Sequence, residues 1–212
     1  MNLLRKLINT QSMKRIPFLL IYSRIIIALA IGIIAYCEIE NKKIFIVVLM
    51  LIGILTDIFD GIIARKLNVS SEKLRTWDSN VDQFFWLIIV AAIFYLNFTF
   101  LKENFIVILV VILLDISAYI ISYVKFRRTV ATHAILSKFW AITLLIFLID
   151  LSINSSSNLP FKICMLLGII SRIEIILIII GLKEWTTDIP SIFSVKKINN
   201  GEKVKKSKLF NS

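Results

Sequence analysis

Six apolar runs of about 20 residues each take up more than half of this 212-residue chain. A helix needs about 20 mostly apolar residues to cross a bilayer, so each run is a candidate membrane span. Hydrophobic residues make up 58% of the chain, against ~45–50% in a typical soluble domain. The sequence therefore predicts an all-α, polytopic membrane bundle with six transmembrane helices. The predicted spans cover residues 17–37, 44–64, 82–101, 105–124, 139–157 and 161–182.

The basic residues between the runs predict the orientation of the chain. The 25 Lys and Arg outnumber the 14 Asp and Glu, which gives a net charge of +11. Nineteen of the 25 precede the first run, follow the sixth, or lie in the second and fourth connections. By the positive-inside rule, both termini are cytoplasmic. We expect residues 1–190 to form the membrane domain and residues 191–212 a basic polar cytoplasmic tail attracted to anionic lipid headgroups.

The composition also excludes several other classes of protein. Nucleic acid is rejected as a partner because the basic residues lie in short loops beside the membrane, not on a folded basic face. Cys37 and Cys164 are too few for a disulfide scaffold, and their spacing is not that of a metal site. The class that remains is a small integral membrane protein whose basic residues lie mainly beside the predicted spans.

Four aspartates lie within 26 residues, where the second predicted span ends and the third begins. Asp57 and Asp60 are three residues apart, and Asp78 and Asp82 are four apart, so each pair shares one helix face. A carboxylate buried in a span costs ~2.5–3.5 kcal/mol and needs a compensating partner. If the two helices pack side by side, the four carboxylates converge at the cytoplasmic boundary. Such oxygen ligands suit Mg²⁺ or Mn²⁺.

Gly61 and Ala64 lie on the same helix face as the first two aspartates. Small side chains allow a diphosphate ligand to approach the helix, but they also serve tight helix packing. Arg65 follows at once, with a planar set of donors that suits phosphate. It also fits as a positive-inside anchor. Because four acidic residues lie nearby, we favour the ligand.

The stretch reads Asp57-x-x-Asp60-Gly61-x-x-Ala64-Arg65, followed by Asp78-x-x-x-Asp82. This pattern resembles the signature of the CDP-alcohol phosphotransferases, which are integral membrane phospholipid synthases. The six-span layout with cytoplasmic termini is also similar to that family.

Weaker similarity and two departures accompany the signature. Pro17-x-x-Leu20-x-x-x-Arg24 resembles the Pro-Asn-x-Leu-Thr-x-x-Arg stretch that opens the family's first span, although Phe18 and Ile21 replace Asn and Thr. Leu74 stands where the family usually has a second Gly, and Gln83 stands where Lys is common. Remodelling of the loop is the expected consequence of Leu74, with altered nucleotide fit or lost activity as the alternative.

The resemblance implies a reaction and a site. A phosphatidyl group moves from CDP-diacylglycerol to an alcohol and CMP is released. The expected acceptor is glycerol 3-phosphate, which gives phosphatidylglycerol phosphate, with inositol phosphate, serine and phosphatidylglycerol as alternatives. Two Mg²⁺ or Mn²⁺ ions are implied, and Asp82 is implied as the general base. A homodimer in a bacterial cell membrane, with its active site facing the cytoplasm, is expected. The implied metal ligands are Asp57, Asp60, Asp78 and Asp82, and the implied contacts to the CDP part are Gly61, Ala64, Arg65 and Ser71.

Three arginines are candidates for binding a phosphate on the acceptor. Arg127 and Arg128 lie in a predicted cytoplasmic loop, where the orientation of the chain alone explains their charge. Arg172 lies inside a predicted span, where an arginine usually faces a polar cavity or a paired acid. Asp115 and Glu174 are possible partners, but Glu174 is two residues away and points to another helix face. Both roles of Arg172 stay open.

Two other functions compete with the transferase. An ion-coupled transporter could use the acidic cluster as its ion site. Against it, the acids lie at one membrane edge, and the sequence has no pair of broken helices in repeated halves. A structural or regulatory relative of the enzyme family is the third possibility, and only Leu74 favours it.

Overall fold

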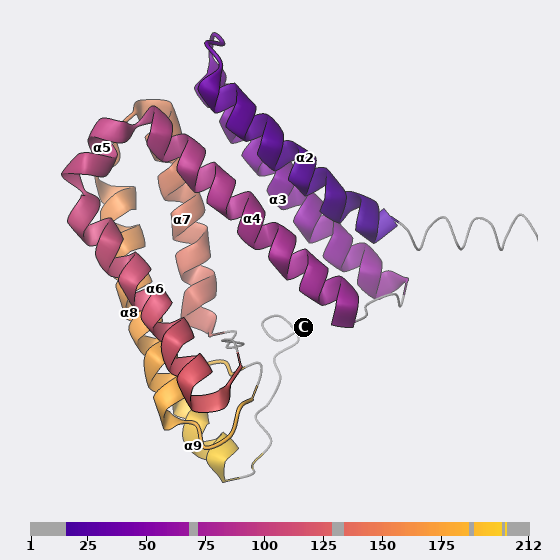
Figure 1. Ribbon diagram of the computed structural model, residues 1–212, viewed down its shortest axis with the longest axis vertical. Coiled ribbons are helices and arrows are strands. Elements are labelled where there is room, and N and C mark those ends of the chain that lie inside the picture. The colour runs from indigo at the N-terminus through magenta and orange to yellow at the C-terminus, as the bar shows by residue number, and fades with distance from the viewer. Residues whose placement is uncertain (1–15, 68–71, 129–133, 187–188, 201, 203–212) are drawn as a thin grey trace, which may run out of the picture. The chain divides into compact units, whose positions relative to one another are not determined.

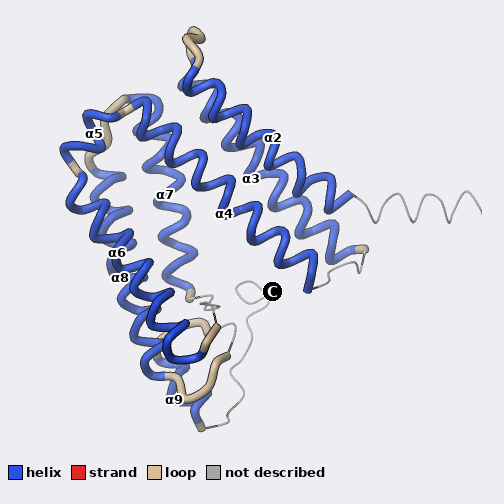
Figure 2. The backbone as a smooth tube through the Cα atoms, viewed as in Figure 1, coloured by secondary structure: helices blue, strands red, loops and turns tan. Residues whose placement is uncertain are grey.

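The structure, a computed structural model, describes residues 16–67, 72–128, 134–186, 189–200 and 202. In two of the helices, the side chains of residues 64, 65, 72–76 and 79 lie outside this description. All regular secondary structure in the described ranges is helical (Figures 1 and 2). The all-α prediction is therefore confirmed. The chain divides into two compact units, one ending at Phe98 and the other beginning at Thr99.

The first unit is built on α2 (Ile16–Tyr36), which packs against both α3 (Lys42–Lys66) and α4 (Glu72–Leu96). Figure 1 shows these three helices side by side. The buried residues of α2 follow one another at intervals of three and four, so they lie on one face of the helix. Arg24 is thus part of a face that otherwise carries apolar residues. The buried residues of α2 are Pro17, Ile21, Arg24, Ala28, Ile31 and Ala35.

Gly53 of α3 has the ring of Phe85 from α4 directly against its backbone. A Cβ atom at this position would overlap the ring of Phe85, which is itself buried. Asp57 lies about one helical turn after Gly53, and Asp82 lies about one turn before Phe85. The contact between Gly53 and Phe85 therefore lies next to the acidic segments of both helices.

The second unit centres on α8, which packs against α6 and α7 and contacts α9. The short helix α5 (Phe98–Glu103) begins at the boundary between the units. Phe100 of α5 joins the rings of Phe147 and Phe161, with ring centroids 5.2–5.9 Å apart. The unit is thereby closed at one end by aromatic packing. Its longer helices and its last helix are α6 (Phe105–Phe126), α7 (Ile135–Asn154), α8 (Leu159–Gly181) and α9 (Phe193–Asn199).

The third predicted span, 82–101, differs from the observed helices. The helix α4 begins at Glu72 and ends at Leu96. Next to that end, the side-chain Nδ2 of Asn97 donates to the carbonyl oxygen of Ile93 at 2.8 Å. A second asparagine, Asn104, donates in the same way to Phe100 at 3.0 Å. The predicted spans 82–101 and 105–124 leave only residues 102–104 as a turn between them, but the structure has two turns, at Asn97 and Asn104, with α5 between them.

Five helices are long and apolar enough to cross a membrane, among the residues that the structure describes. They coincide with five of the six predicted spans. The remaining predicted span corresponds to the shorter apolar helical segment Asn80–Leu96. The count of six spans stays a prediction. The five are Ile16–Tyr36, Lys42–Ile63, Phe105–Phe126, Ile135–Asn154 and Leu159–Gly181.

Part of the segment expected as a polar tail folds as α9. Val195 packs against Gly181, where a Cβ atom would come within 3.0 Å of the valine. Asn199 donates through Nδ2 to the carbonyl oxygen of Gly181 at 2.8 Å, and its Oδ1 accepts from the backbone N–H of Lys183 at 3.0 Å. These contacts occupy backbone groups left free where α8 ends, so α9 is attached to the end of that helix.

Candidate active site

The structure brings the four aspartates of the sequence motif together around one guanidinium group. Asp57 and Asp60 lie on α3, and Asp78 and Asp82 lie on α4. The guanidinium belongs to Arg24 of α2. The site is therefore built by all three helices of the first unit.

Each terminal nitrogen of Arg24 contacts two carboxylates. Nη1 donates to Oδ1 of Asp57 at 2.6 Å and also contacts Asp82. Nη2 donates to Oδ2 of Asp60 at 2.6 Å and also contacts Asp78. Hydrogen bonds between charged groups are roughly twice as strong as those between neutral groups. Arg24 thus ties α2 to both acidic helices.

The cluster is buried on one side and open on the other. The side chains of Arg24 and Asp60 are 0% and 4% exposed, whereas those of Asp57, Asp78 and Asp82 are 33–43% exposed. Four carboxylates and one guanidinium carry a formal charge of −3 when all are ionised. An excess of negative charge that is only partly solvated attracts cations strongly.

The residues present fit a divalent cation. One carboxylate oxygen from each of Asp57, Asp60 and Asp78 lies within 4.8 Å of the others. Oxygen ligands on opposite sides of a bound Mg²⁺ are about 4 Å apart, because each Mg–O distance is ~2.0–2.1 Å. Carboxylates are also the ligand type that Mg²⁺ and Mn²⁺ prefer. Both the chemistry and the spacing of these donors therefore suit such an ion.

Gly61 follows the acidic pair on α3 and faces open space. A Cβ atom at position 61 would meet no described atom within 4 Å. Among the described residues, no neighbouring helix therefore requires a glycine at this position. The open space at Gly61 leaves room for a ligand. Ala64 and Arg65 continue α3, but their side chains lie outside the described residues, as does the whole of Ser71.

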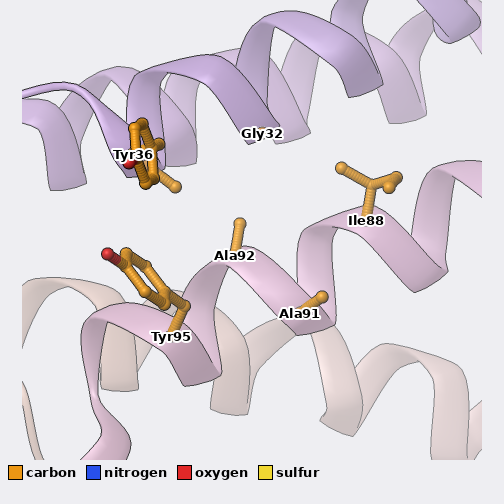
Figure 3. Close-up of a pocket in the computed structure, with 7 residues that line it drawn as sticks. Gly32, Tyr36, Ile88, Ala91, Ala92 and Tyr95 are labelled. Atoms are coloured by element: carbon orange, nitrogen blue, oxygen red, sulfur yellow. The ribbon is translucent and has the colours of Figure 1, made fainter.

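An apolar groove lies between α2 and α4 in the first unit (Figure 3). It lies toward the C-terminal ends of both helices, whereas Arg24, Asp78 and Asp82 lie toward their N-terminal ends. The groove offers no charged side chain for a diphosphate. The lining residues are Gly32, Ala35, Tyr36, Ile88, Ala91, Ala92 and Tyr95.

Comparison with protein families agrees with the resemblance seen in the motif. The family model described as CDP-alcohol phosphatidyltransferase matches residues 14–183. The chain belongs to this family. Comparisons with curated proteins and with solved structures gave no match. The match spans both structural units and includes Arg24 and all four aspartates.

As a CDP-alcohol phosphatidyltransferase, the protein is a transferase of phospholipid synthesis that moves a phosphatidyl group from a CDP-alcohol. Its apolar helices and its family make it an integral membrane protein. The family uses divalent metal ions, in agreement with the donor set on α3 and α4. This assignment favours the transferase over the ion-coupled transporter.

Two candidate acceptor residues of this transferase lie where α6 ends. Arg127 closes the helix in the left-handed conformation, with φ 54°, and its guanidinium lies 5.8 Å from the centre of the Tyr123 ring. Arg128 lies 4.7 Å from the centre of the Trp185 ring. Both arginines are exposed. Aromatic contacts of this kind orient a guanidinium while leaving its N–H groups accessible.

Arg172, the third candidate, has partners inside the second unit. Its Nε lies 2.8 Å from Oδ1 of Asp115, as an ion pair and not a directed hydrogen bond. Its guanidinium lies 4.2 Å from the centre of the Trp140 ring. Glu174 instead accepts a hydrogen bond from the backbone N–H of Ile192 at 3.3 Å. The three arginines belong to the second unit, and the four aspartates belong to the first.

Arg24 and Gly53 are site residues that the sequence motif does not predict. Arg24 belongs to the stretch that resembles the opening of the family's first span. A stronger indication was available, because a charged residue inside an apolar span needs an opposite charge nearby. Four unpaired aspartates in neighbouring spans supplied that charge. Gly53 carried no comparable indication, since its role depends on the ring of Phe85 from another helix.

Proposed function

We propose that this enzyme transfers the phosphatidyl group of CDP-diacylglycerol to glycerol 3-phosphate, giving phosphatidylglycerol phosphate and CMP. One observation carries the proposal: the four motif aspartates, from two helices, gather at a single partly open site. The family supports phosphatidyl transfer from a CDP-alcohol. The choice of acceptor is the finer part of the proposal.

Asp57, Asp60 and Asp78 would hold Mg²⁺ or Mn²⁺, with Asp82 as a further ligand and two ions in total. When bound, such ions neutralise the diphosphate and stabilise the leaving CMP. Asp60 is the buried member of the set, so its position is fixed by the surrounding helices. Asp57 and Asp78 are partly exposed and face the side from which a substrate can approach.

Asp82 would act as the general base. Its carboxylate takes the proton from the acceptor hydroxyl as that oxygen bonds to the phosphorus of the phosphatidyl group. The bond from this phosphorus to the bridging oxygen of the diphosphate breaks, and CMP leaves with that oxygen. A positioned base of this kind contributes ~10²–10⁴-fold in rate. The partial exposure of Asp82 supports the role, because the carboxylate is accessible to a hydroxyl group.

The CDP part of the donor would lie along α3 beyond the acidic pair. The open space at Gly61 supports this placement. Ala64, Arg65 and Ser71 are proposed contacts from the sequence motif alone. Arg65 would contact a phosphate through its planar donors.

The acceptor phosphate requires a cationic partner. Arg127 and Arg128 are exposed and oriented by aromatic rings, which supports a role in binding it. Arg172 remains a candidate, but its contacts with Asp115 and Trp140 favour the structural alternative. Serine, inositol phosphate and phosphatidylglycerol stay as the other acceptors to be tested.

We further propose a homodimer in a bacterial cell membrane, with six spans and with both termini and the active site on the cytoplasmic side. The basic connections support this orientation. A Lys208→Cys variant in intact cells tests it. An impermeant thiol reagent should leave this cysteine unlabelled until the membrane is permeabilised. Labelling of intact cells would place the tail outside.

The reaction itself is tested by CMP release. Purified protein in detergent is incubated with CDP-diacylglycerol, Mg²⁺ or Mn²⁺, and each of four acceptors in turn. Glycerol 3-phosphate should give the fastest release, and Asp82→Asn should lose it. A faster reaction with another acceptor would correct the substrate and leave the reaction type intact. No CMP release with any acceptor would reject the transferase activity and favour a structural or regulatory relative of the enzyme family, as Leu74 suggests.

A further inference from the structure

Arg24 connects the two acidic helices in a crossed pattern. Nη1 contacts Asp57 of α3 and Asp82 of α4, and Nη2 contacts Asp60 of α3 and Asp78 of α4. Each nitrogen therefore bridges both helices. A lysine could not reproduce this arrangement, because its single nitrogen offers one point of contact and not a planar fork.

The guanidinium and the carboxylates compensate each other's charge. A lone buried ion costs several kcal/mol even after the protein relaxes, and Arg24 is fully buried in a predicted membrane span. Four carboxylates close together repel one another unless a cation lies among them. The contacts of Arg24 with the four carboxylates lower both the cost of burying the guanidinium and the repulsion among the carboxylates. The first unit is thus kept together by a cation that the chain itself supplies.

The same carboxylates are the proposed metal ligands. The oxygens of Asp57, Asp60 and Asp78 that suit a divalent ion lie within 4.8 Å of one another, and all three residues already contact Arg24. A guanidinium and a divalent cation that share these carboxylates repel each other. The two cations are therefore alternatives for the same negative charge.

The contacts of Arg24 are also incomplete. Its buried Nε has no hydrogen-bond partner among the described residues, and an unpaired buried donor is unfavourable. The guanidinium is consequently held by its two terminal nitrogens alone, on the side where the carboxylates lie.

We propose that Arg24 is an internal counter-cation of the active site, which holds the four carboxylates together in the metal-free protein and competes with the divalent ion for them. This inference rests on the proposed metal site. Arg24 then acts as a positioning residue: it keeps α3 and α4 in register and sets how tightly the site binds its ion.

The test measures Mn²⁺ binding in the absence of any substrate. Free Mn²⁺ is followed by electron paramagnetic resonance as the full-length protein in detergent is titrated. Arg24→Gln removes the charge and keeps a planar group, so the variant should bind Mn²⁺ about tenfold more tightly or better. Arg172→Gln is the matched control, because it removes another span arginine paired to a carboxylate in the second unit. It should bind Mn²⁺ as the wild type does.

Thermal unfolding supplies a second measurement. With EDTA, Arg24→Gln should unfold at a lower temperature than the wild type, because nothing then compensates the carboxylates. Added Mn²⁺ should raise its unfolding temperature by more than it raises that of the wild type. If the variant binds Mn²⁺ no more tightly, and loses equal stability with and without the ion, Arg24 is a packing residue and the inference is wrong.

Two further proteins make the result unambiguous. If Arg24→Gln does not fold, Arg24→Lys takes its place. Its charge is retained without the fork, so tighter Mn²⁺ binding by a smaller factor is expected, and unchanged or weaker binding overturns the inference. Asp60→Asn should weaken binding in every case. If the wild type itself binds no Mn²⁺, the proposed metal site fails and the inference fails with it. Binding by the wild type without the effect of Arg24 rejects the inference alone.

Discussion

Gly53 of α3 lies directly against the ring of Phe85 of α4, with no space for a Cβ atom between them. This contact lies about one helical turn from Asp57 on one helix and from Asp82 on the other. A residue without a side chain thus leaves space for the Phe85 ring beside the acidic segments of both helices. Its replacement tests whether this packing positions the active site.

Gly53→Ala should destabilise the protein and reduce its activity. The added methyl group would overlap the ring of a buried phenylalanine, and overpacking of this kind typically costs ~1–3 kcal/mol. Thermal unfolding in detergent and CMP release measure the two effects. The double variant with Phe85→Leu should recover much of the stability, because the smaller side chain removes the overlap. Failure of the second substitution to recover any stability would show that the contact is not the cause.

Gly61→Ala, the matched substitution eight residues later, should behave in the opposite way. No described atom lies within 4 Å of the added Cβ, and replacing a helical glycine by alanine is favourable by ~1 kcal/mol. The unfolding temperature should therefore stay the same or rise. If the CDP part of the donor lies here, the KM for CDP-diacylglycerol should rise several-fold. A drop in stability like that of Gly53→Ala would instead favour the packing role of this glycine.

Asp60→Asn and Asp82→Asn should separate ion binding from proton transfer. Asp60 is buried and is proposed only as a ligand, so its variant should regain activity as Mn²⁺ is raised. Asp82 is also the proposed base, and its loss should lower kcat by ~10²–10⁴-fold at any Mn²⁺ concentration. CMP release across a Mn²⁺ titration measures both responses. Equal recovery of the two variants would remove the general-base role from Asp82.

The helices follow closely from the sequence, but their polar ends do not. Apolar runs placed a span at 44–64, and α3 covers Lys42–Lys66. The predicted span at 82–101 starts ten residues after the beginning of α4 at Glu72. The first part of α4 is polar, and hydropathy does not distinguish such a segment from a loop. The predicted span also extends beyond Leu96, where α4 ends. The helix ends there because Asn97 interrupts the apolar stretch and donates a hydrogen bond to the carbonyl oxygen of Ile93. A count of apolar residues along the chain detects neither the polar start of α4 nor the turn at Asn97.

Only the part of the site that depends on spacing along single helices could be predicted from the sequence. Spacing along one helix places Asp57 beside Asp60, and Asp78 beside Asp82, and the motif then predicts that the pairs meet. What joins them comes from a third helix. The sequence of α2 does not state which of its faces meets α3 and α4, so Arg24 could be noticed as an unusual residue but not placed. Local periodicity predicts helix faces, and tertiary packing decides which faces meet.

Arg172→Gln distinguishes the two roles left open for this arginine. Its partner Asp115 of α6 lies 2.8 Å away, and its guanidinium lies 4.2 Å from the centre of the Trp140 ring of α7. Loss of the guanidinium removes the ion pair and the cation–π contact, and should destabilise the protein by ~1–2 kcal/mol. If the role is structural, the double variant with Asp115→Asn should recover stability, because no unpaired carboxylate remains in the span.

The acceptor kinetics of the same variants also distinguish the two roles of Arg172. In the structural case, the KM for glycerol 3-phosphate should change little in the single variant and return to the wild-type value in the double variant. In the acceptor case, the KM should rise at least tenfold in both, since Asp115→Asn cannot replace the lost positive charge. Arg127→Gln and Arg128→Gln serve as comparisons, because these exposed arginines are the better candidates for the acceptor phosphate. They should raise that KM with little change in unfolding temperature, because surface substitutions usually alter stability by less than about 0.5 kcal/mol.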